Sequence, residues 1–233
     1  MSILSLPPIP DDVGLFWLFT TCLLYALAVQ IRAKLGGSLY AQPLLWVAAL
    51  LLGGLYWADI ALSDYQKGGD WLLLALALST TAIAAPIYSN RHIIRAAAKP
   101  FLASLLVGSS AAVILAVASA YILGLDDMIT ATLATRTTTT PIAMGLADEI
   151  GGLPVLAMLI AIFAGNITVL MAPFLFRLVG VVDVRAQGVA LGVIGSGIGT
   201  AEAVRQSHLA GSFAGLAMGV NGVLTGALLP LFF

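Results

Sequence analysis

A short polar run interrupts apolar sequence at residues 136–141, which read RTTTTP. The arginine supplies a fixed positive charge, and the four threonines supply hydroxyls that donate or accept hydrogen bonds. The residue before a proline is pushed out of the α region, and proline favours the first position of a helix. We therefore expect Thr140 to cap a half-helix that begins at Pro141 and stops at Gly151 and Gly152.

The start of such a half-helix is suited to bind an anion. Its first N–H groups have no partner within the helix, and the helix dipole adds partial positive charge there. Arg136 stands one turn earlier, and the hydroxyls of Thr139 and Thr140 lie beside the terminus. A structural interpretation is also open. Threonines often bond their own i−4 carbonyls and only bend a helix, and the arginine can snorkel or pair with Asp126 or Asp127.

A second interrupted stretch, residues 188–206, reads GVALGVIGSGIGTAEAVRQ. Each glycine lowers helix propensity by about 1 kcal/mol, so the four glycines between 192 and 199 predict a break. We expect Thr200 to cap a short second half that begins at Ala201, and Ser196 and Thr200 to add hydroxyls to the site. Close packing of helices through small residues is the other interpretation, and the two are compatible.

A third weak point is the stretch STTAIAAPIY at 79–88. Pro86 has no N–H to donate to the carbonyl of Ala82, which predicts a kink near Thr80 and Thr81. These two threonines and Asn221 complete the candidate binding residues. Asn221 has a structural alternative, a hydrogen bond between helices.

The composition places the chain in a membrane. Of its residues 61% are hydrophobic and 9% are charged, and the mean hydropathy is +1.06. A soluble domain carries about 25% charged residues, so this chain lacks the polar surface for water, and the lipid bilayer is its expected surrounding. No basic cluster is dense enough to bind nucleic-acid phosphates. Cys22 is the sole cysteine, which excludes an intrachain disulfide.

Crossing a bilayer takes about 20 apolar residues. Six apolar runs are candidates, the second of them short: 13–31, 43–58, 71–88, 101–123, 153–176 and 209–233. Two further stretches, 128–150 and 186–205, are long enough but are interrupted by threonine, serine and glycine. The sequence therefore predicts one all-α polytopic membrane domain over 1–233.

Charged loops predict the orientation, because cytoplasmic loops are enriched in Lys and Arg. Basic residues follow the first run and precede the fourth, whereas acidic residues precede the first run and follow the second and the fourth. We expect a multi-pass protein of the cell inner membrane with its N-terminus outside. Arg177 and Arg185 should be inside, so 128–150 has to enter and leave at the outer side as a re-entrant hairpin.

The stretch 186–205 leaves two topologies open. If it crosses outward through its break, the C-terminus is inside and the chain has about seven spans plus one re-entrant hairpin. Its halves, 13–123 and 128–233, then form an inverted repeat with broken helices, the plan of many secondary transporters. If it forms a second hairpin, six spans remain and the C-terminus is outside. We favour the inverted repeat.

Several motifs resemble the LrgB/CidB family of membrane proteins. They are TTPIAMGLADEIGG (139–152), GIGTAEA (197–203) and GSFAGLAMGVNGVLTGALLP (211–230). The similarity continues upstream through residues 42–43, 65–72 and 86–88, so it covers nearly the whole chain. The threonine–proline motif followed by the glycine-rich block is not a generic membrane pattern.

The resemblance implies a function and a partner. The family is named for antiholin-like proteins that influence murein hydrolase activity and lysis in bacteria, and it typically works beside a separate small LrgA/CidA-type membrane protein. A plant chloroplast relative exchanges glycolate and glycerate, and bacterial members are linked to pyruvate uptake. The family usually has Lys where Arg136 stands, which keeps the charge. It usually has Ser-His where Gly195 and Ser196 stand, and the difference removes a possible proton acceptor.

The leading hypothesis is a secondary transporter or exchanger of small monocarboxylates of the glycolate, glycerate, pyruvate or lactate class, which could assemble as a homo-oligomer. Arg136 and the helix terminus at Pro141 would bind the carboxylate. The hydroxyls of Thr139, Thr140, Ser196 and Thr200 would bind the rest. The alternative is a holin-like or antiholin-like protein that modulates lysis.

The sequence predicts neither an enzyme nor a cofactor. It has no HExxH zinc motif, and Ser196 has no recognisable base and orienting acid. His92 and His208 have no further metal ligands at usable spacing.

Overall fold

The computed structural model describes residues 11–34, 43–69, 71–72, 75, 78, 82 and 84–233. Within these residues every regular element is a helix, which confirms the all-α fold class. The chain divides into two compact units, Met1–Ala82 and Ile83–Phe233, and each is described by itself. The predicted repeat halves follow a different division and stay a prediction.

The first unit contains α1 (Asp12–Lys34), α2 (Pro43–Trp57) and α3 (Leu62–Gln66). α2 packs against α1. Lys67 lies 2.9 Å from the carboxylate of Asp64 and 3.6 Å from that of Asp11. The start of α1 and the segment after α3 therefore lie at the same end of this unit, as the alternation of spans predicts.

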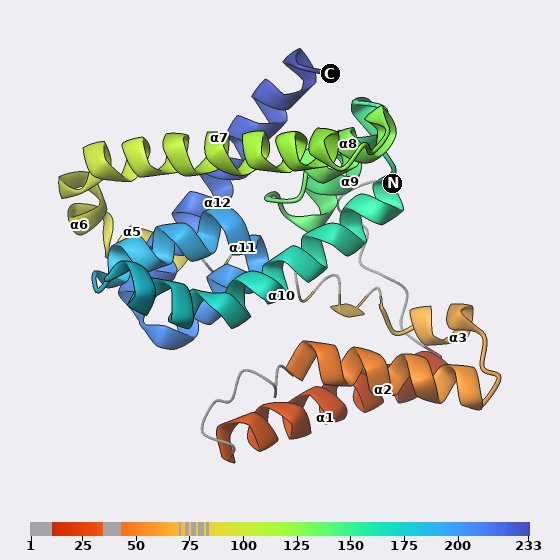
Figure 1. Ribbon diagram of the computed structural model, residues 1–233. Coiled ribbons are helices and arrows are strands. Elements are labelled where there is room, and N and C mark those ends of the chain that lie inside the picture. The colour runs from red at the N-terminus through yellow and green to blue at the C-terminus, as the bar shows by residue number, and fades with distance from the viewer. Residues whose placement is uncertain are drawn as a thin grey trace. The chain divides into compact units, whose positions relative to one another are not determined.

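The second unit holds the two interrupted segments (Figure 1). Its helices are α5 (Ala84–Ser89), α6 (Arg91–Ala96), α7 (Ala98–Ile122), α8 (Asp127–Ala134), α9 (Thr140–Glu149), α10 (Pro154–Val179), α11 (Val184–Gln206) and α12 (His208–Leu228), followed by the 3₁₀ turn η2 (Leu229–Leu231).

Four helices in the described part of the chain have the length and apolarity of a membrane span. They are α1, α7, α10 and the continuous stretch His208–Leu231, and α2 contains a shorter apolar helix. Four of the six predicted runs are thus long apolar helices. Much of the run 71–88, including Thr80 and Thr81 and the kink predicted there, lies outside the described residues.

α8 and α9 form a hairpin that enters and leaves at one end of the unit. α8 returns along α7 until the guanidinium of Arg136 lies 3.3 Å from the carbonyl oxygen of Ala112. Ala112 precedes the end of α7 by about 15 Å at the helical rise of 1.5 Å per residue. α9 then comes back, and the amide of Leu153 donates to the hydroxyl of Thr132 near the start of α8 (2.8 Å). The hairpin predicted at 128–150 is confirmed, and its entry from the outer side of the membrane stays a prediction.

α11 is a second hairpin rather than a crossing helix. Its backbone breaks at Ser196 (φ 48°, ψ −130°). A Cβ on Gly199 would collide with the carbonyl oxygen of Leu191, although a straight helix would separate these residues by about 12 Å. The two halves of α11 therefore pack against each other in opposite directions. The predicted outward crossing of 186–205 is wrong, because the glycines let the chain reverse inside the protein.

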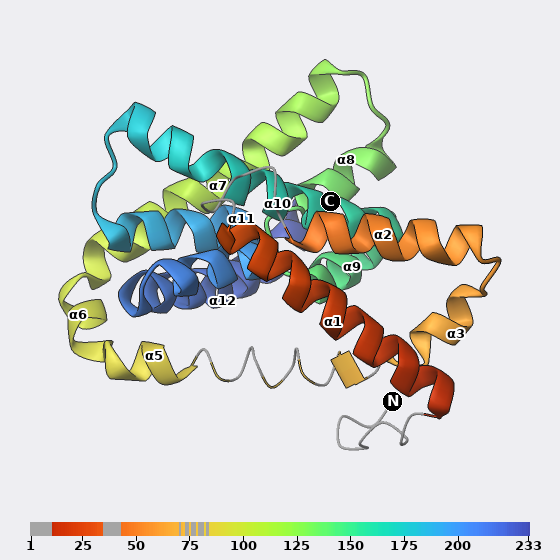
Figure 2. The same ribbon diagram turned by 90° about the horizontal axis from the view of Figure 1, so that it is seen from below.

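α12 then runs parallel to the first half of α11. Both views show the two helices side by side (Figure 1 and Figure 2). A Cβ on Gly188 would meet the carbonyl of Ala210, and one on Gly192 would meet that of Ala214. α12 ends beside α8, since Phe233 and Asp127 line one cavity. The C-terminus thus lies at the same end as Asp127, and the favoured topology with an opposite C-terminus is corrected.

Charge is divided between the two ends of this unit. One end carries Arg91, Arg95, Lys99, Arg177, Arg185 and Arg205, and the other carries Asp126, Asp127, Asp148 and Glu149. The two acids at the basic end are paired. Asp183 contacts Arg185 at 2.5 Å, a hydrogen bond that lowers the pKa of the Asp183 carboxyl to about 2, and Glu202 contacts Arg205 at 2.6 Å.

This topology predicts which loops share a side of the membrane. In a Cys22→Ser background, cysteines introduced at Leu125 and Phe233 should react with an impermeant thiol reagent from one side. A cysteine at Val182 should react only from the other side, because α10 separates it from Leu125. The measurement is labelling of intact and of permeabilised cells. Labelling of position 233 from the same side as position 182 would show that α11 crosses.

Candidate functional site

The tips of both hairpins lie at one level of α10. Ala143 and Ala147 of α9 form a buried cluster with Ala157 and Ala161 of the antiparallel α10. One further turn in this register places the start of α9 opposite Gly165. The tip of α11 lies at the same level, because a Cβ on Gly165 would stand 3.1 Å from the carbonyl oxygen of Gly195. Gly165 is near the middle of α10.

α12 joins the two tips through one turn of helix. Its Asn221 donates from Nδ2 to the carbonyl oxygen of Thr137 in the first hairpin (2.9 Å). The hydroxyl of Thr200, in the second hairpin, lies 3.6 Å from the sulfur of Met218. The centre of the unit is therefore built from both hairpin tips, the middle of α10 and the turn of α12 between Met218 and Asn221.

Arg136 has no acidic partner among the described residues. Its half-buried guanidinium makes one hydrogen bond, to the carbonyl of Ala112 at 3.3 Å. The predicted alternative, a pair with Asp126 or Asp127, is not formed, because these acids lie at the start of α8, where Asp126 caps the amide of Ile129. The guanidinium instead stays at the depth of the hairpin tip.

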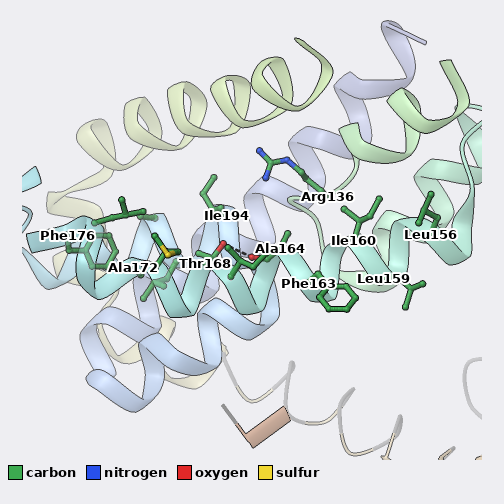
Figure 3. A pocket seen from close by; sticks show the side chains of 15 residues that line it. Arg136, Leu156, Leu159, Ile160, Phe163, Ala164, Thr168, Ala172, Phe176 and Ile194 are labelled. Atoms are coloured by element: carbon green, nitrogen blue, oxygen red, sulfur yellow. Dashed lines mark hydrogen bonds between the residues drawn. The ribbon is translucent and has the colours of Figure 1, made fainter. Parts of the chain in front are cut away.

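Arg136 also borders a cavity of about 720 Å³ along α10. Figure 3 shows its side chain directed toward α7, at the edge of a wall made mostly of apolar side chains such as Phe163 and Ile194. Thr168 is a polar residue of this wall, but its hydroxyl is bonded to the carbonyl of Ala164 (2.8 Å). The positive charge of Arg136 thus faces a largely apolar space.

The threonine run divides into two roles. The hydroxyl of Thr135 donates to the carbonyl of Thr132 in the last turn of α8 (2.9 Å), and that of Thr138 donates to the carbonyl of Thr135, the C-cap of α8 (2.8 Å). Both hydroxyls therefore satisfy backbone groups. The structural interpretation therefore holds for Thr138. Thr137 differs, because its hydroxyl is buried and has no hydrogen-bond partner.

The start of α9 lies one residue earlier than predicted. Thr139 is the N-cap and α9 begins at Thr140, so the expected cap at Thr140 is wrong by one position. The Thr139 side chain makes no capping hydrogen bond. Thr139 and Thr140 are half-buried, whereas Pro141 is exposed. The two hydroxyls thus stand at the helix start, as predicted.

The break in α11 falls at Ser196 and not at Thr200. Gly195 and Gly197 flank Ser196, and this small-residue segment allows the reversal, so Thr200 lies inside the second half-helix instead of capping it. Thr200 is fully buried and Ser196 is 7% exposed. The Ser196 hydroxyl has no partner.

Four buried side-chain oxygens of this unit lack a hydrogen-bond partner. They belong to Thr137, Ser196, Asn221 and Thr225. An unsatisfied buried polar atom costs about 1–3 kcal/mol, so these four oxygens are candidates for contact with a ligand. Thr137 and Thr225 were not among the candidate residues. Thr225 follows Asn221 by four residues, which puts both on one face of α12, and that spacing is a signal in the sequence.

These features define the class of the protein: an all-helical, multi-pass membrane protein with two hairpins whose tips reach one level in its interior. The LrgB-like family model matches residues 21–233, and the chain belongs to this family. The family predicted from the sequence motifs is thereby confirmed.

The relatives are similar over most of their length. The chain is 29% identical to YwbG of Bacillus subtilis (strain 168) over 213 residues, which are 91% of this chain and 94% of that protein. It is 28% identical to YxaC of the same organism over 189 residues, 81% of this chain and 82% of that protein. It is 25% identical to the antiholin-like protein LrgB of Bacillus cereus (strain B4264) over 217 residues, 93% and 94% of the two chains. No solved structure matches the chain.

The second hairpin predicts a contrast between two glycines. Gly199→Ala should lower the thermal midpoint of the purified protein by several degrees, because its Cβ would collide with the carbonyl of Leu191 and such overpacking costs about 1–3 kcal/mol. Gly197→Ala is the matched control, since no atom lies within 4 Å of its Cβ position. Equal midpoints of the two variants would contradict the folded-back geometry.

Proposed function

We propose that this protein is a secondary transporter or exchanger of small monocarboxylates. The observation that carries the proposal is the guanidinium of Arg136, held at the depth of the hairpin tips without a carboxylate partner among the described residues. Removing a charge from water costs several kcal/mol unless an opposite charge offsets it. A carboxylate substrate beside Arg136 would provide that charge.

The interrupted backbone supports transport. In lipid, irregular backbone is tolerated only where it is buried in protein or lines a water-filled cavity. Broken helices near the bilayer midplane are a common way for transporters to bind substrate, because half-helix starts favour anions. α9 starts three residues after Thr137 and four after Arg136. The hydroxyls of Thr139, Thr140 and Ser196 would bind the remaining polar atoms of the substrate.

The chemical class of the substrate follows from the family resemblance and from the number of anion-binding groups at the site. A single guanidinium and one helix start fit one carboxylate group, so the substrate would be a monocarboxylate such as glycolate, glycerate, pyruvate or lactate. By the positive-inside rule, the basic end of the second unit would face the cytoplasm and the C-terminus the outside of a bacterial inner membrane. The N-terminus would also be outside. A small LrgA/CidA-type membrane protein would be the partner, and the chain would form homo-oligomers.

A second candidate function is antiholin-like control of lysis. The observation that favours it is the name of the relatives from Bacillus cereus, antiholin-like protein LrgB, at 25% identity. Murein hydrolase activity and lysis should be measured in cells that express the wild type or a variant without transport. If the transport-deficient variant changes lysis as the wild type does, the antiholin function does not depend on transport.

The direct test of transport is uptake of labelled glycolate, glycerate, pyruvate and lactate into liposomes that contain the purified protein, with and without a pH gradient. Uptake of at least one of these acids above protein-free liposomes is expected. No uptake of any of them under either condition would reject the proposed substrate class.

Arg136 is the residue whose substitution should affect binding most. A charge-assisted hydrogen bond is worth about 1.5–3 kcal/mol, so Arg136→Gln should weaken substrate affinity about 10- to 100-fold. Arg136→Lys should retain part of the affinity, because lysine keeps the charge but not the planar fork. The measurements are the substrate Kd and the thermal midpoint of each protein.

The matched control is Arg177→Gln, which removes an exposed charge at the end of α10 and should leave Kd unchanged. An unchanged Kd in Arg136→Gln, together with a lowered midpoint, would make Arg136 a structural residue and would remove it from the site.

A further inference from the structure

The amide of Asn221 presents an oxygen that needs a partner. Its Nδ2 donates to the carbonyl oxygen of Thr137 (2.9 Å). This bond fixes the orientation of the amide, because in the reverse orientation Oδ1 would face the carbonyl oxygen, and two acceptors form no hydrogen bond. Oδ1 is then buried with no hydrogen-bond partner, and the residue is only 1% exposed. An amide oxygen is an acceptor only, so its missing partner is a donor or a cation.

Two residues adjacent to Asn221 also carry a buried hydroxyl without a partner. Thr137, whose carbonyl holds Asn221, also has an unpartnered hydroxyl, and it is 1% exposed. Thr225 follows Asn221 by one helical turn, so its unpartnered hydroxyl projects from the same face of α12. Thr225 is 4% exposed. The three residues thus lie together where α12 meets the first hairpin.

A cavity reaches Thr225, one of these three residues, from the acidic end of the unit. It has a volume of about 900 Å³, and it is lined by Asp127 and Tyr121 at that end and by Ser109 and Thr225 farther in. Ser109 lies about 20 Å from the end of α7 at the helical rise, about one turn deeper than Ala112, which Arg136 contacts. Acidic side chains at an entrance raise the local concentration of cations.

The residue types around Asn221, Thr137 and Thr225 indicate which ligand fits. No Asp, Glu or His occurs in residues 134–146, 190–200 or 209–228, which form the two hairpin tips and the part of α12 that follows its first residue, His208. Divalent calcium and magnesium sites in proteins use carboxylates, so this group of neutral oxygens fits a monovalent cation. Neutral oxygens also do not titrate, so a proton is not the ligand of this place.

We propose that Asn221 Oδ1 and the hydroxyls of Thr137 and Thr225 bind a dehydrated alkali-metal cation, with sodium as its probe, between α12 and the first hairpin. The cation would enter through the cavity at the acidic end. This site lies on the α12 side of the hairpin, whereas the guanidinium of Arg136 is bonded to α7.

Binding at the cation site would be coupled to binding at the anion site. This coupling, unlike the cation site itself, rests on the proposed function. Arg136 and Thr137 are neighbours in the chain, so a bound cation and the guanidinium repel each other. A carboxylate bound to Arg136 removes this repulsion, and each ligand then strengthens the binding of the other by the same factor. A carboxylate should therefore lower the apparent sodium Kd.

The test is the thermal midpoint of the purified full-length protein in sodium chloride and in N-methyl-D-glucamine chloride at equal ionic strength. A ligand that binds only the folded state raises the midpoint as its concentration rises. We expect a saturable rise of several degrees in sodium that the organic cation does not produce. No difference between the two salts would overturn the proposal.

Thr225→Val is the decisive variant, because it replaces the hydroxyl with a methyl group at nearly constant volume and leaves the Asn221–Thr137 hydrogen bond in place. It should raise the apparent sodium Kd at least tenfold while the midpoint without sodium changes little. Thr130→Val is the matched control, since its buried hydroxyl already has a partner, the carbonyl of Asp126 (2.9 Å). A full sodium effect in Thr225→Val would overturn the proposal.

Failure of the cation site and failure of transport are distinguishable. Sodium stabilisation that Thr225→Val removes, in a protein without carboxylate uptake, would support the cation site and reject the transport function. Carboxylate uptake by a protein with no sodium stabilisation would keep the transport function and overturn the cation site.

Discussion

The close approach of backbones between α11 and α12 is the constraint on which the second unit depends. Gly188 and Gly192 pack against carbonyl groups of α12, and Gly199 packs against a carbonyl of its own hairpin. Any side chain at these positions would separate the two halves of α11 from each other or from α12. Because apolar burial drives helix association weakly in lipid, dense packing through small residues supplies much of the attraction. The position of Ser196 in the interior follows from this packing.

The two hairpins satisfy their interrupted backbones by different means. In the first, the hydroxyls of Thr135 and Thr138 donate to carbonyls at the end of α8. In the second, the glycines around Ser196 permit a reversal within a few residues, and Ser196 itself adopts a positive φ. The first hairpin therefore depends on side-chain hydroxyls, and the second depends on the absence of side chains. Each leaves one buried hydroxyl without a partner, on Thr137 and on Ser196.

The sequence predicted the helical class, six apolar runs of which four are long apolar helices in the described residues, the first hairpin and the family. These conclusions rest on apolar run length, on the Thr-Pro step and on motifs, all of which are local. It did not predict that 186–205 folds back, because the same glycines suit a broken crossing helix and a hairpin. The difference is decided by contacts with Leu191, Ala210 and Ala214. Thr225 was missed because a threonine in an apolar helix usually bonds its own i−4 carbonyl. The sequence alone does not show that its hydroxyl is left without a partner.

α7 is followed by a hairpin that enters from the acidic end, and α10 is followed by one that enters from the basic end. The same two-part unit, a long helix and then a hairpin, thus occurs twice in opposite directions. Withdrawal of one hairpin would open the centre toward its own end while the other hairpin still closed the opposite end. In the proposed transporter these hairpins would be two separate barriers of similar construction, one for each face of the membrane, and the centre need never be open to both faces at once.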